Sequence, residues 1–206
     1  MTEQKNIQPL TFKIFDLYET EGIQVKDVGL KDAINLTPKL ALKSHGRNVQ
    51  KFGQTKVNIV ERLINKIGVA GHRGKKHKLM VGTSTGKYSK NTGIVLDAFE
   101  QIAKKTGKNP IEILIKAVEN SAPRDEITVI EYGGARYPQA VDVSPLRRVN
   151  LALKHIIHGA SEKAFGKKKD LAQGIAEEIM LASEGNQESF AVKKKIESEK
   201  QADSAR

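Results

Sequence analysis

The feature that most constrains the fold is a pair of strand-like runs joined by Gly133 and Gly134. Side chains of the first run, residues 127–132, alternate between two faces. Two adjacent glycines accept the positive φ angles that a tight hairpin turn requires. Pro138 has no N–H to donate to a ladder, so the second run should face outward at that point. The pattern predicts a hairpin over residues 126–143. Because an isolated arm about 20 Å long is marginal in water, something outside the chain should hold it.

Prolines predict a helix on each side of this hairpin. Pro123 bars the α region at Ala122 and so ends the preceding helix. Ser144 is a suitable N-cap for the next helix, with Pro145 at its first position, where no amide is missed. Two helices should therefore clamp the root of one projecting arm.

Apolar residues recur at helical spacing in five stretches of the chain. The stripes are Val57, Val60, Ile64 and Ile67, ending at Gly68; Ile94, Val95, Ala98, Phe99 and Ile102, ending near Gly107; Ile111, Leu114, Ile115 and Val118, capped by Asn109; Leu146, Val149, Leu153, Ile156 and Ile157, ending at Gly159; and Leu171, Ile175, Ile179 and Ala182, between Asp170 and Gly185. Residues 70–92, rich in Gly, Ser and Lys, read as a loop.

These elements predict a mainly α fold, a bundle of five or six helices with one projecting β-hairpin arm. Residues 1–55 should form an N-terminal extension, with short strands and one helix near residues 38–43. Residues 56–188 should form the helical domain that carries the hairpin. Residues 189–206 form a basic C-terminal tail, predicted as a largely polar helix or a disordered segment.

Composition restricts the class of protein. The chain has 206 residues, a net charge of +11 and no cysteine, which excludes disulfides, thiol nucleophiles and cysteine-ligated metals. A balance this basic favours a polyanionic partner, either nucleic acid or an anionic membrane surface. The first residues lack the apolar core of a signal peptide, and no run reaches the ~18 apolar residues of a membrane span. The leading class is a soluble, cytoplasmic nucleic-acid binder.

The positive charge is unevenly placed. Residues 62–90 contain eight Lys and Arg residues and no acid, and such a stretch repels itself unless an anion relieves it. The hairpin also has Tyr132 and Tyr137 near its tip, which could stack on bases or pack across the strands. Candidate nucleic-acid contacts are Lys75, Lys76 and Lys78 in the acid-free stretch; Arg124 and Arg136 on the hairpin; Arg147 and Arg148 in the first turn of the helix after it; and Lys193, Lys194 and Lys195 near the C-terminus.

Two motifs that could indicate a phosphate-binding loop or a zinc site do not have the required sequence. Residues 82–88 (GTSTGKY) have three residues between the glycines and Tyr after Lys, whereas a phosphate-binding loop needs four and then Ser or Thr. His155, His158 and Glu162 would form a poor zinc site, because Gly159 is expected to break the helix between them. No nucleophile stands beside a base. We therefore expect no catalytic residue, no metal, no cofactor and no enzymatic activity.

Several short runs resemble ribosomal protein seven of the small subunit, in the archaeal and eukaryotic branch of that family. The matching runs are 58–63 (NIVERL), 74–76 (GKK), 78–80 (KLM), 98–100 (AFE), 106–107 (TG), 109–110 (NP), 120–121 (NS), 123–124 (PR), 139–150 (QAVDVSPLRRVN) and 191–195 (AVKKK). The resemblance covers about residues 56–206, and the run 139–150 is its most specific part.

The resemblance implies a helical bundle with a hairpin arm that binds the three-prime major (head) domain of small-subunit rRNA and nucleates head assembly. It places Lys75, Lys76, Lys78, Arg124, Arg147 and Arg148 on the RNA face, with Arg136 on the hairpin. The hairpin would reach toward exit-site tRNA and mRNA, near ribosomal protein eleven of the platform, with the C-terminal lysines on the same side. Bacterial members carry arginines where this chain has residues 128–132 (TVIEY), which leaves Arg136 as the charged donor near the tip.

Two alternatives have other consequences. A DNA-binding helical module would read the major groove with the helix from Pro145 to Gly159, through Arg147, Arg148, Asn150 and Lys154, but no dimer feature or helix-turn-helix spacing accompanies it. An enzyme would show turnover that depends on His155 or His158.

Overall fold

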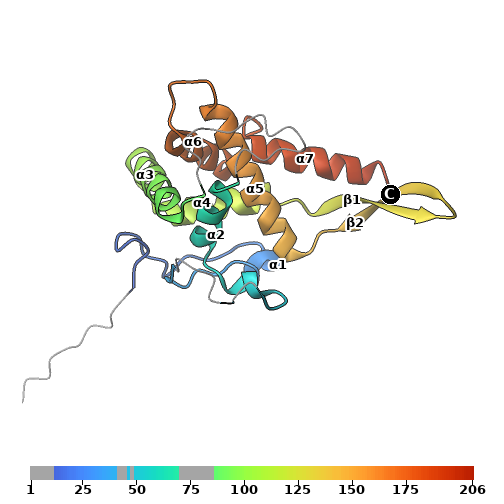
Figure 1. The fold of residues 1–206 in the computed structure, drawn as a ribbon, viewed down its shortest axis with the longest axis horizontal. Helices are drawn as coiled ribbons and strands as arrows, with labels where there is room; N and C mark the ends of the chain where they lie inside the picture. The colour runs from blue at the N-terminus through green and yellow to red at the C-terminus, as the bar shows by residue number, and fades with distance from the viewer. Residues whose placement is uncertain (1–11, 41–45, 47–48, 70–85) are drawn as a thin grey trace, which may run out of the picture.

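The computed structural model describes residues 12–40, 46, 49–69 and 86–206. Within these residues a bundle of helices surrounds an aliphatic core, and one two-stranded hairpin projects from its side (Figure 1). The prediction of a mainly α fold with a projecting hairpin arm is confirmed. No helix of the described part of the chain is long and apolar enough to cross a membrane.

The first three long helices form where the apolar stripes predict them. α2 spans Ile59–Ile67, α3 spans Tyr88–Thr106 and α4 spans Pro110–Ser121. Their stripe residues are buried, apart from a half-buried Ile94. Asn109 accepts a hydrogen bond from the N–H of Ile111 at 3.0 Å and so caps α4 as expected. Gly107 ends α3 with a φ of 64°.

The loop predicted over residues 70–92 ends earlier in the structure than the sequence suggested. α3 already begins at Tyr88, so the loop assignment of residues 88–92 is wrong. Thr92 donates its hydroxyl to the carbonyl of Tyr88 at 2.9 Å within the helix, and Asn91 is buried. Residues 70–85 lie outside the described part of the chain.

The helix after the hairpin is longer than predicted. α5 spans Pro145–Ala164 and passes through Gly159, so the prediction that this glycine ends the helix is wrong. A Cβ at this position would lie 2.7 Å from Cδ of Glu178 and from Cβ of Phe190. Gly159 therefore permits close approach of neighbouring helices instead of a turn.

The two C-terminal helices pack back onto the bundle. α6 spans Leu171–Ser183, and Gly185, with a φ of 70°, follows its end. The segment expected to be a polar helix or disordered is a helix, α7, spanning Phe190–Asp203 and packed against α5 and the hairpin. Ser144 and Asp170 occupy the predicted N-cap positions of α5 and α6, although neither side chain makes a capping hydrogen bond.

The hairpin has the predicted turn. β1 spans Asp125–Tyr132 and β2 spans Ala135–Asp142, with Tyr132 opposite Ala135. The turn residues Gly133 and Gly134 have φ angles of 58° and 81°. In an antiparallel ladder, hydrogen-bonded residue pairs alternate with non-hydrogen-bonded pairs. Counting from the hydrogen-bonded pair next to the turn, Tyr132 and Ala135, the pair of Val129 and Pro138 is of the non-hydrogen-bonded kind. An N–H at position 138 would therefore point away from β1, so proline is tolerated there.

The arm is fixed at its root by α7, which runs beside it in Figure 1 with the C-terminus close to the strands. Ser198 donates its hydroxyl to the carbonyl of Asp125 at 3.1 Å, and Glu199 accepts the N–H of Arg124 at 3.0 Å. Arg206 forms an ion pair with the Asp125 carboxylate at 2.7 Å. The base of the arm is therefore ordered by the chain itself, while its outer part is not covered.

The N-terminal segment contributes to the same core. It contains the single-turn helix α1, Val28–Lys31, and the 3₁₀ helix η1, Gly53–Lys56. Ile14, Leu30 and Ala33 are buried with the bundle helices. The prediction of a helix near residues 38–43 is wrong for residues 38–40, which are not helical. The chain turns there instead, and Lys39 donates its N–H to the Thr37 carbonyl at 2.7 Å. Residues 41–43 lie outside the described part of the chain.

Candidate nucleic-acid interface

The predicted lysines of the acid-free stretch, Lys75, Lys76 and Lys78, lie outside the described residues. Their place is bounded by Val69, just beyond the end of α2, and by Gly86, just before α3. Their contact with RNA stays a prediction from the sequence.

Arg147 lies at the surface, but it already has a partner. Its guanidinium donates to both carboxylate oxygens of Glu126, at 2.7 and 2.8 Å. These hydrogen bonds lower the pKa of Glu126 and raise that of Arg147. The Arg147 side chain is still 58% exposed, so a phosphate can reach it without displacing the bundle.

Arg148 is buried, with 9% of its surface exposed. It donates to the Asp27 carboxylate at 2.8 Å and to the Pro123 carbonyl at 3.2 Å. Although burial opposes it, hydrogen bonds from Arg148 and from the Gly29 N–H lower the pKa of Asp27. Arg148 therefore joins the N-terminal segment to the turn before the hairpin and to α5. This geometry favours a structural role for Arg148 over direct contact with phosphate.

The hairpin arginines differ in environment. Arg124 lies at the root, where its backbone N–H is held by Glu199 and its side chain is exposed. Arg136 lies next to the turn, opposite Glu131 on β1, with Nε 3.5 Å from the carboxylate. Both of these side chains are largely exposed, so this pair is weak and open to competition from another charged group.

The outer hairpin exposes apolar and aromatic surface as well as charge. Tyr132 and Tyr137 are 82% and 58% exposed, and Val129 and Ile130 are also exposed. Cross-strand pairing puts both tyrosines on one face, with Tyr137 opposite Ile130. Since the neighbouring strand does not cover the tyrosines, their rings are available to stack on a partner.

The C-terminal lysines lie on the first half of α7. Lys194 pairs with Glu197 at 2.6 Å, and its ammonium lies 5.9 Å from the centre of the Phe190 ring. Lys193 is exposed and Lys195 is half-buried, and neither makes an ion pair within the described part of the chain.

The helix face proposed for a DNA-binding module is engaged within the protein. Besides the pairing of Arg147 and the burial of Arg148, Asn150 accepts a hydrogen bond from Arg62 at 3.2 Å and donates one to Gln54 at 3.1 Å. Three of the four candidate base-reading side chains on α5 thus hold other parts of the chain, which disfavours that alternative.

The two histidines considered as metal ligands lie on one helix. The rings of His155 and His158 lie 6.5 Å apart between centres, and both belong to the unbroken α5. The described residues contain no group of three side chains suited to hold a metal ion.

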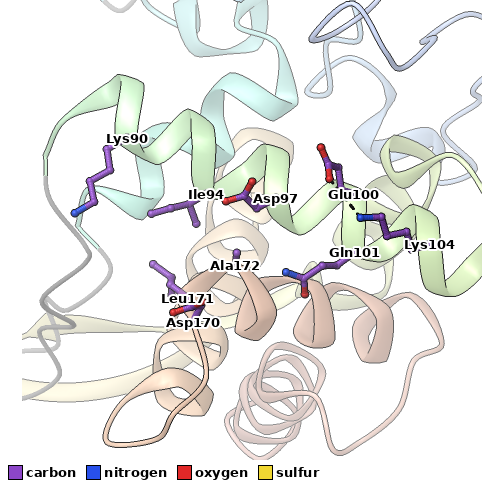
Figure 2. A pocket seen from close by; sticks show the side chains of 9 residues that line it. All are labelled: Lys90, Ile94, Asp97, Glu100, Gln101, Lys104, Asp170, Leu171 and Ala172. Carbon is purple, nitrogen blue, oxygen red and sulfur yellow. Dashed lines mark ion pairs between the residues drawn. The ribbon is translucent and has the colours of Figure 1, made fainter.

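A separate groove between α3 and the start of α6 has a volume of about 380 Å³ (Figure 2). Its charged lining comprises the carboxylates of Asp97, Glu100 and Asp170 and the ammonium groups of Lys90 and Lys104. Lys104 lies 3.6 Å from Glu100, the pair joined by a dashed line in Figure 2. Opposite charges of similar number make this groove a poor attractor for a polyanion.

One pair of lysines that the structure brings together was not predicted as a site from the sequence. Lys66 falls inside the acid-free stretch but was not singled out, and Lys154 was considered only for reading DNA. The structure brings both to one groove between α2 and α5. The signal available in the sequence was weak, since the two lysines are separated by 88 residues (154 − 66).

The sequence of this chain is similar to that of known proteins over nearly its whole length. The family model described as Ribosomal protein S7p/S5e matches residues 35–206. The protein named small ribosomal subunit protein uS7 in Nanoarchaeum equitans is 45% identical over 96% of this chain and 100% of its own length. Proteins of the same name from Methanosphaera stadtmanae and Cenarchaeum symbiosum are each 44% identical, over 95% and 100% of this chain. The similarity therefore reaches further into the N-terminal segment than the motifs over residues 56–206 indicate.

Proposed function

Because this chain belongs to the ribosomal protein S7p/S5e family, we propose that it binds the three-prime major (head) domain of small-subunit rRNA and nucleates assembly of the head. Membership makes the chain a protein of the small ribosomal subunit, working in the cytoplasm as part of the ribosome and not as an enzyme.

The observation that carries the proposal is the hairpin arm. Its root is fixed by Ser198, Glu199 and Arg206, whereas its outer residues are exposed on both strands. A two-stranded arm with uncovered apolar and aromatic side chains is stable only when a partner surface supports it. A net charge of +11 favours a polyanion as that partner.

The proposed division of labour has two parts. The bundle, with Lys75, Lys76, Lys78, Arg124 and Arg147, binds the head domain of the rRNA. The hairpin, with Arg136 at its tip, reaches toward exit-site tRNA and mRNA, near ribosomal protein eleven of the platform. The C-terminal lysines Lys193, Lys194 and Lys195 face the same region. Arg148 supports this surface indirectly, by fixing the start of α5 against Asp27.

Replacing Lys75, Lys76 and Lys78 together with alanine tests the RNA-binding role. The variant should bind head-domain rRNA at least ~10-fold more weakly, and the slope of log affinity against log salt should fall by up to about 3, since up to three phosphate contacts are lost. Filter binding over a series of salt concentrations measures both quantities. The free energy of unfolding should stay within about 0.5 kcal/mol of the original.

The matched control replaces Lys104, Lys105 and Lys116, which removes the same charge. Lys104 and Lys116 pair with Glu100 and Glu112. Lys105 lies near Glu177, whose pKa is lowered mainly by the hydrogen bond from Lys169 and to a smaller extent by the charge of Lys105. This control should retain nearly full affinity. If both triple variants lose affinity equally, the effect is one of total charge and the proposed contact is wrong.

A further inference from the structure

A small groove lies where the end of α2 meets the middle of α5. It has a volume of about 260 Å³ and is lined by Lys66, Val69, Lys154, Ile157 and His158. Lys66 comes from the last turn of α2 and is half-buried, while Lys154 comes from α5 and is exposed. Two ammonium groups from different helices thus share one concave surface with an apolar wall.

Buried charge behind the groove adds to this field. Arg62, one turn before Lys66, is 5% exposed and donates to the Ala33 carbonyl at 2.8 Å and to the Asn150 side chain at 3.2 Å. Both partners are neutral, and Nε of Arg62 has no hydrogen-bond partner within the described residues. Burial lowers the pKa of Arg62 to about 10, so it remains a cation at neutral pH.

Within the described part of the chain, the cations of the groove lack carboxylate partners. Arg62, Lys66 and Lys154 make no ion pair with any carboxylate that the structure describes. The pKa of Glu126 is lowered mainly by its hydrogen bonds from Arg147 and to a smaller extent by the charge of Lys154. The Glu126 carboxylate is therefore paired with Arg147 and not with Lys154. Burial, and then repulsion from Arg62 and Lys154, lower the pKa of Lys66. Like charges held together in this way cost stability unless an anion joins them.

We propose that this α2–α5 groove binds a phosphodiester group of the RNA backbone, with Lys66 and Lys154 as the direct donors and Arg62 as a buried charge behind them. The inference rests on the proposed function and adds a site to it. Lysine binds phosphate as a mobile point charge, which suits two donors from separate helices. Val69, which is half exposed at the edge of the groove, offers apolar surface for the carbon atoms of a ribose beside the phosphate.

The mixed groove between α3 and α6 provides a contrast within the same molecule (Figure 2). There the ammonium groups of Lys90 and Lys104 are outnumbered by the carboxylates of Asp97, Glu100 and Asp170. An anion entering that groove meets repulsion as well as attraction. The α2–α5 groove has two lysines and no carboxylate in its lining.

The test is a double substitution, Lys66→Gln with Lys154→Gln, in the full chain. Glutamine keeps part of the aliphatic side chain and a polar end while it removes the charge. Affinity for a head-domain rRNA fragment should fall about 10-fold or more, and the salt slope should fall by about 1, because one lost phosphate contact removes roughly 0.9 from the slope on duplex nucleic acid. The control, Lys104→Gln with Lys116→Gln, removes the same charge from lysines paired with Glu100 and Glu112 and should keep the original affinity and slope.

Thermal melting without RNA separates binding from packing. Lys66→Gln should melt at the same temperature as the original chain or higher, because it removes a half-buried charge repelled by Arg62 and Lys154. A large drop in melting temperature would show that Lys66 holds the fold, which overturns the assignment. An unchanged affinity and salt slope in the double variant would also overturn it, while leaving the proposed function standing. If the original chain does not distinguish head-domain RNA from unrelated RNA, the proposed function fails and this site fails with it.

Discussion

Replacing Glu178 with alanine is expected to destabilise the folded chain by roughly 3 kcal/mol, at the lower end of the range for breaking a buried ion pair. The Glu178 side chain has no exposed surface. Its carboxylate accepts the hydroxyl of Ser189 at 2.7 Å and the N–H of Ala191 at 3.1 Å, and it pairs with Lys163 at 2.6 Å. Nζ of Lys163 is buried beside this carboxylate, but about a quarter of the Lys163 side chain is exposed, so the long side chain can turn its charge toward water once Glu178 is gone, which places the loss near the lower end.

This single carboxylate joins three helices. Lys163 belongs to α5, Glu178 to α6, and Ser189 with Ala191 begins α7. Gly159 leaves the space that the carboxylate occupies, because a Cβ there would meet Cδ of Glu178 at 2.7 Å. Since α7 also fixes the root of the hairpin, losing Glu178 should loosen the arm as well as the bundle.

Urea denaturation measures the effect, and the neighbouring residue supplies the control. Glu177 forms an ion pair with Lys169 at 2.8 Å, but both side chains are substantially exposed. Glu177→Ala should therefore cost only about 0–1 kcal/mol. Equal, small losses for the two variants would show that the Glu178 carboxylate does not hold α7 against α5 and α6.

Replacing Gly174 with alanine should also destabilise the chain, by about 1–3 kcal/mol. A Cβ at this position would lie 2.6 Å from the backbone oxygen of Ala160 on α5. Backbone of a neighbouring helix cannot move aside as the end of a flexible side chain can, so α5 and α6 must separate. The helix-propensity gain of about 1 kcal/mol from Gly to Ala offsets only part of this cost.

Gly93 on α3 provides the matched control of opposite sign. A Cβ added there meets no atom within 4 Å, so Gly93→Ala keeps the propensity gain without a clash. It should stabilise the chain by about 0.5–1 kcal/mol. Denaturation midpoints of the two variants should shift in opposite directions. A stabilising Gly174→Ala would show that α5 and α6 are not closely packed at that point.

The helical core was predictable because its signal is local. Stripes such as the one that includes Val60, Ile64 and Ile67 bury one face of a helix, and the sequence shows that face directly. The hairpin was predictable for the same reason, since Gly133 and Gly134 define the turn by their own backbone freedom.

Features that depend on distant contacts were not predictable. A glycine that ends a helix looks the same in sequence as one that allows close packing, and Gly159 is of the second kind because of Glu178 and Phe190. Likewise, Ile14 and Leu30 show no helical period, yet tertiary packing buries both in the core.

The sequence shows which basic residues the chain has, but not which of them are exposed and which are buried beside a carboxylate. The first-turn arginines of α5 looked equivalent, yet Arg147 is exposed beside Glu126 whereas Arg148 is buried beside Asp27. Their partners lie 21 and 121 residues away along the chain, so only the fold distinguishes them.

We propose that the helical bundle and its projecting arm present cationic surface to the head-domain rRNA. The most direct test titrates the complete chain against a three-prime major domain transcript and against an unrelated RNA of equal length, at several salt concentrations. If six to ten phosphates are neutralised, affinity should fall by about 10³–10⁵ between roughly 50 and 200 mM salt, and the head-domain transcript should bind more tightly throughout. Equal affinity for the two RNAs, or no binding to the head-domain transcript at low salt, would contradict the claim.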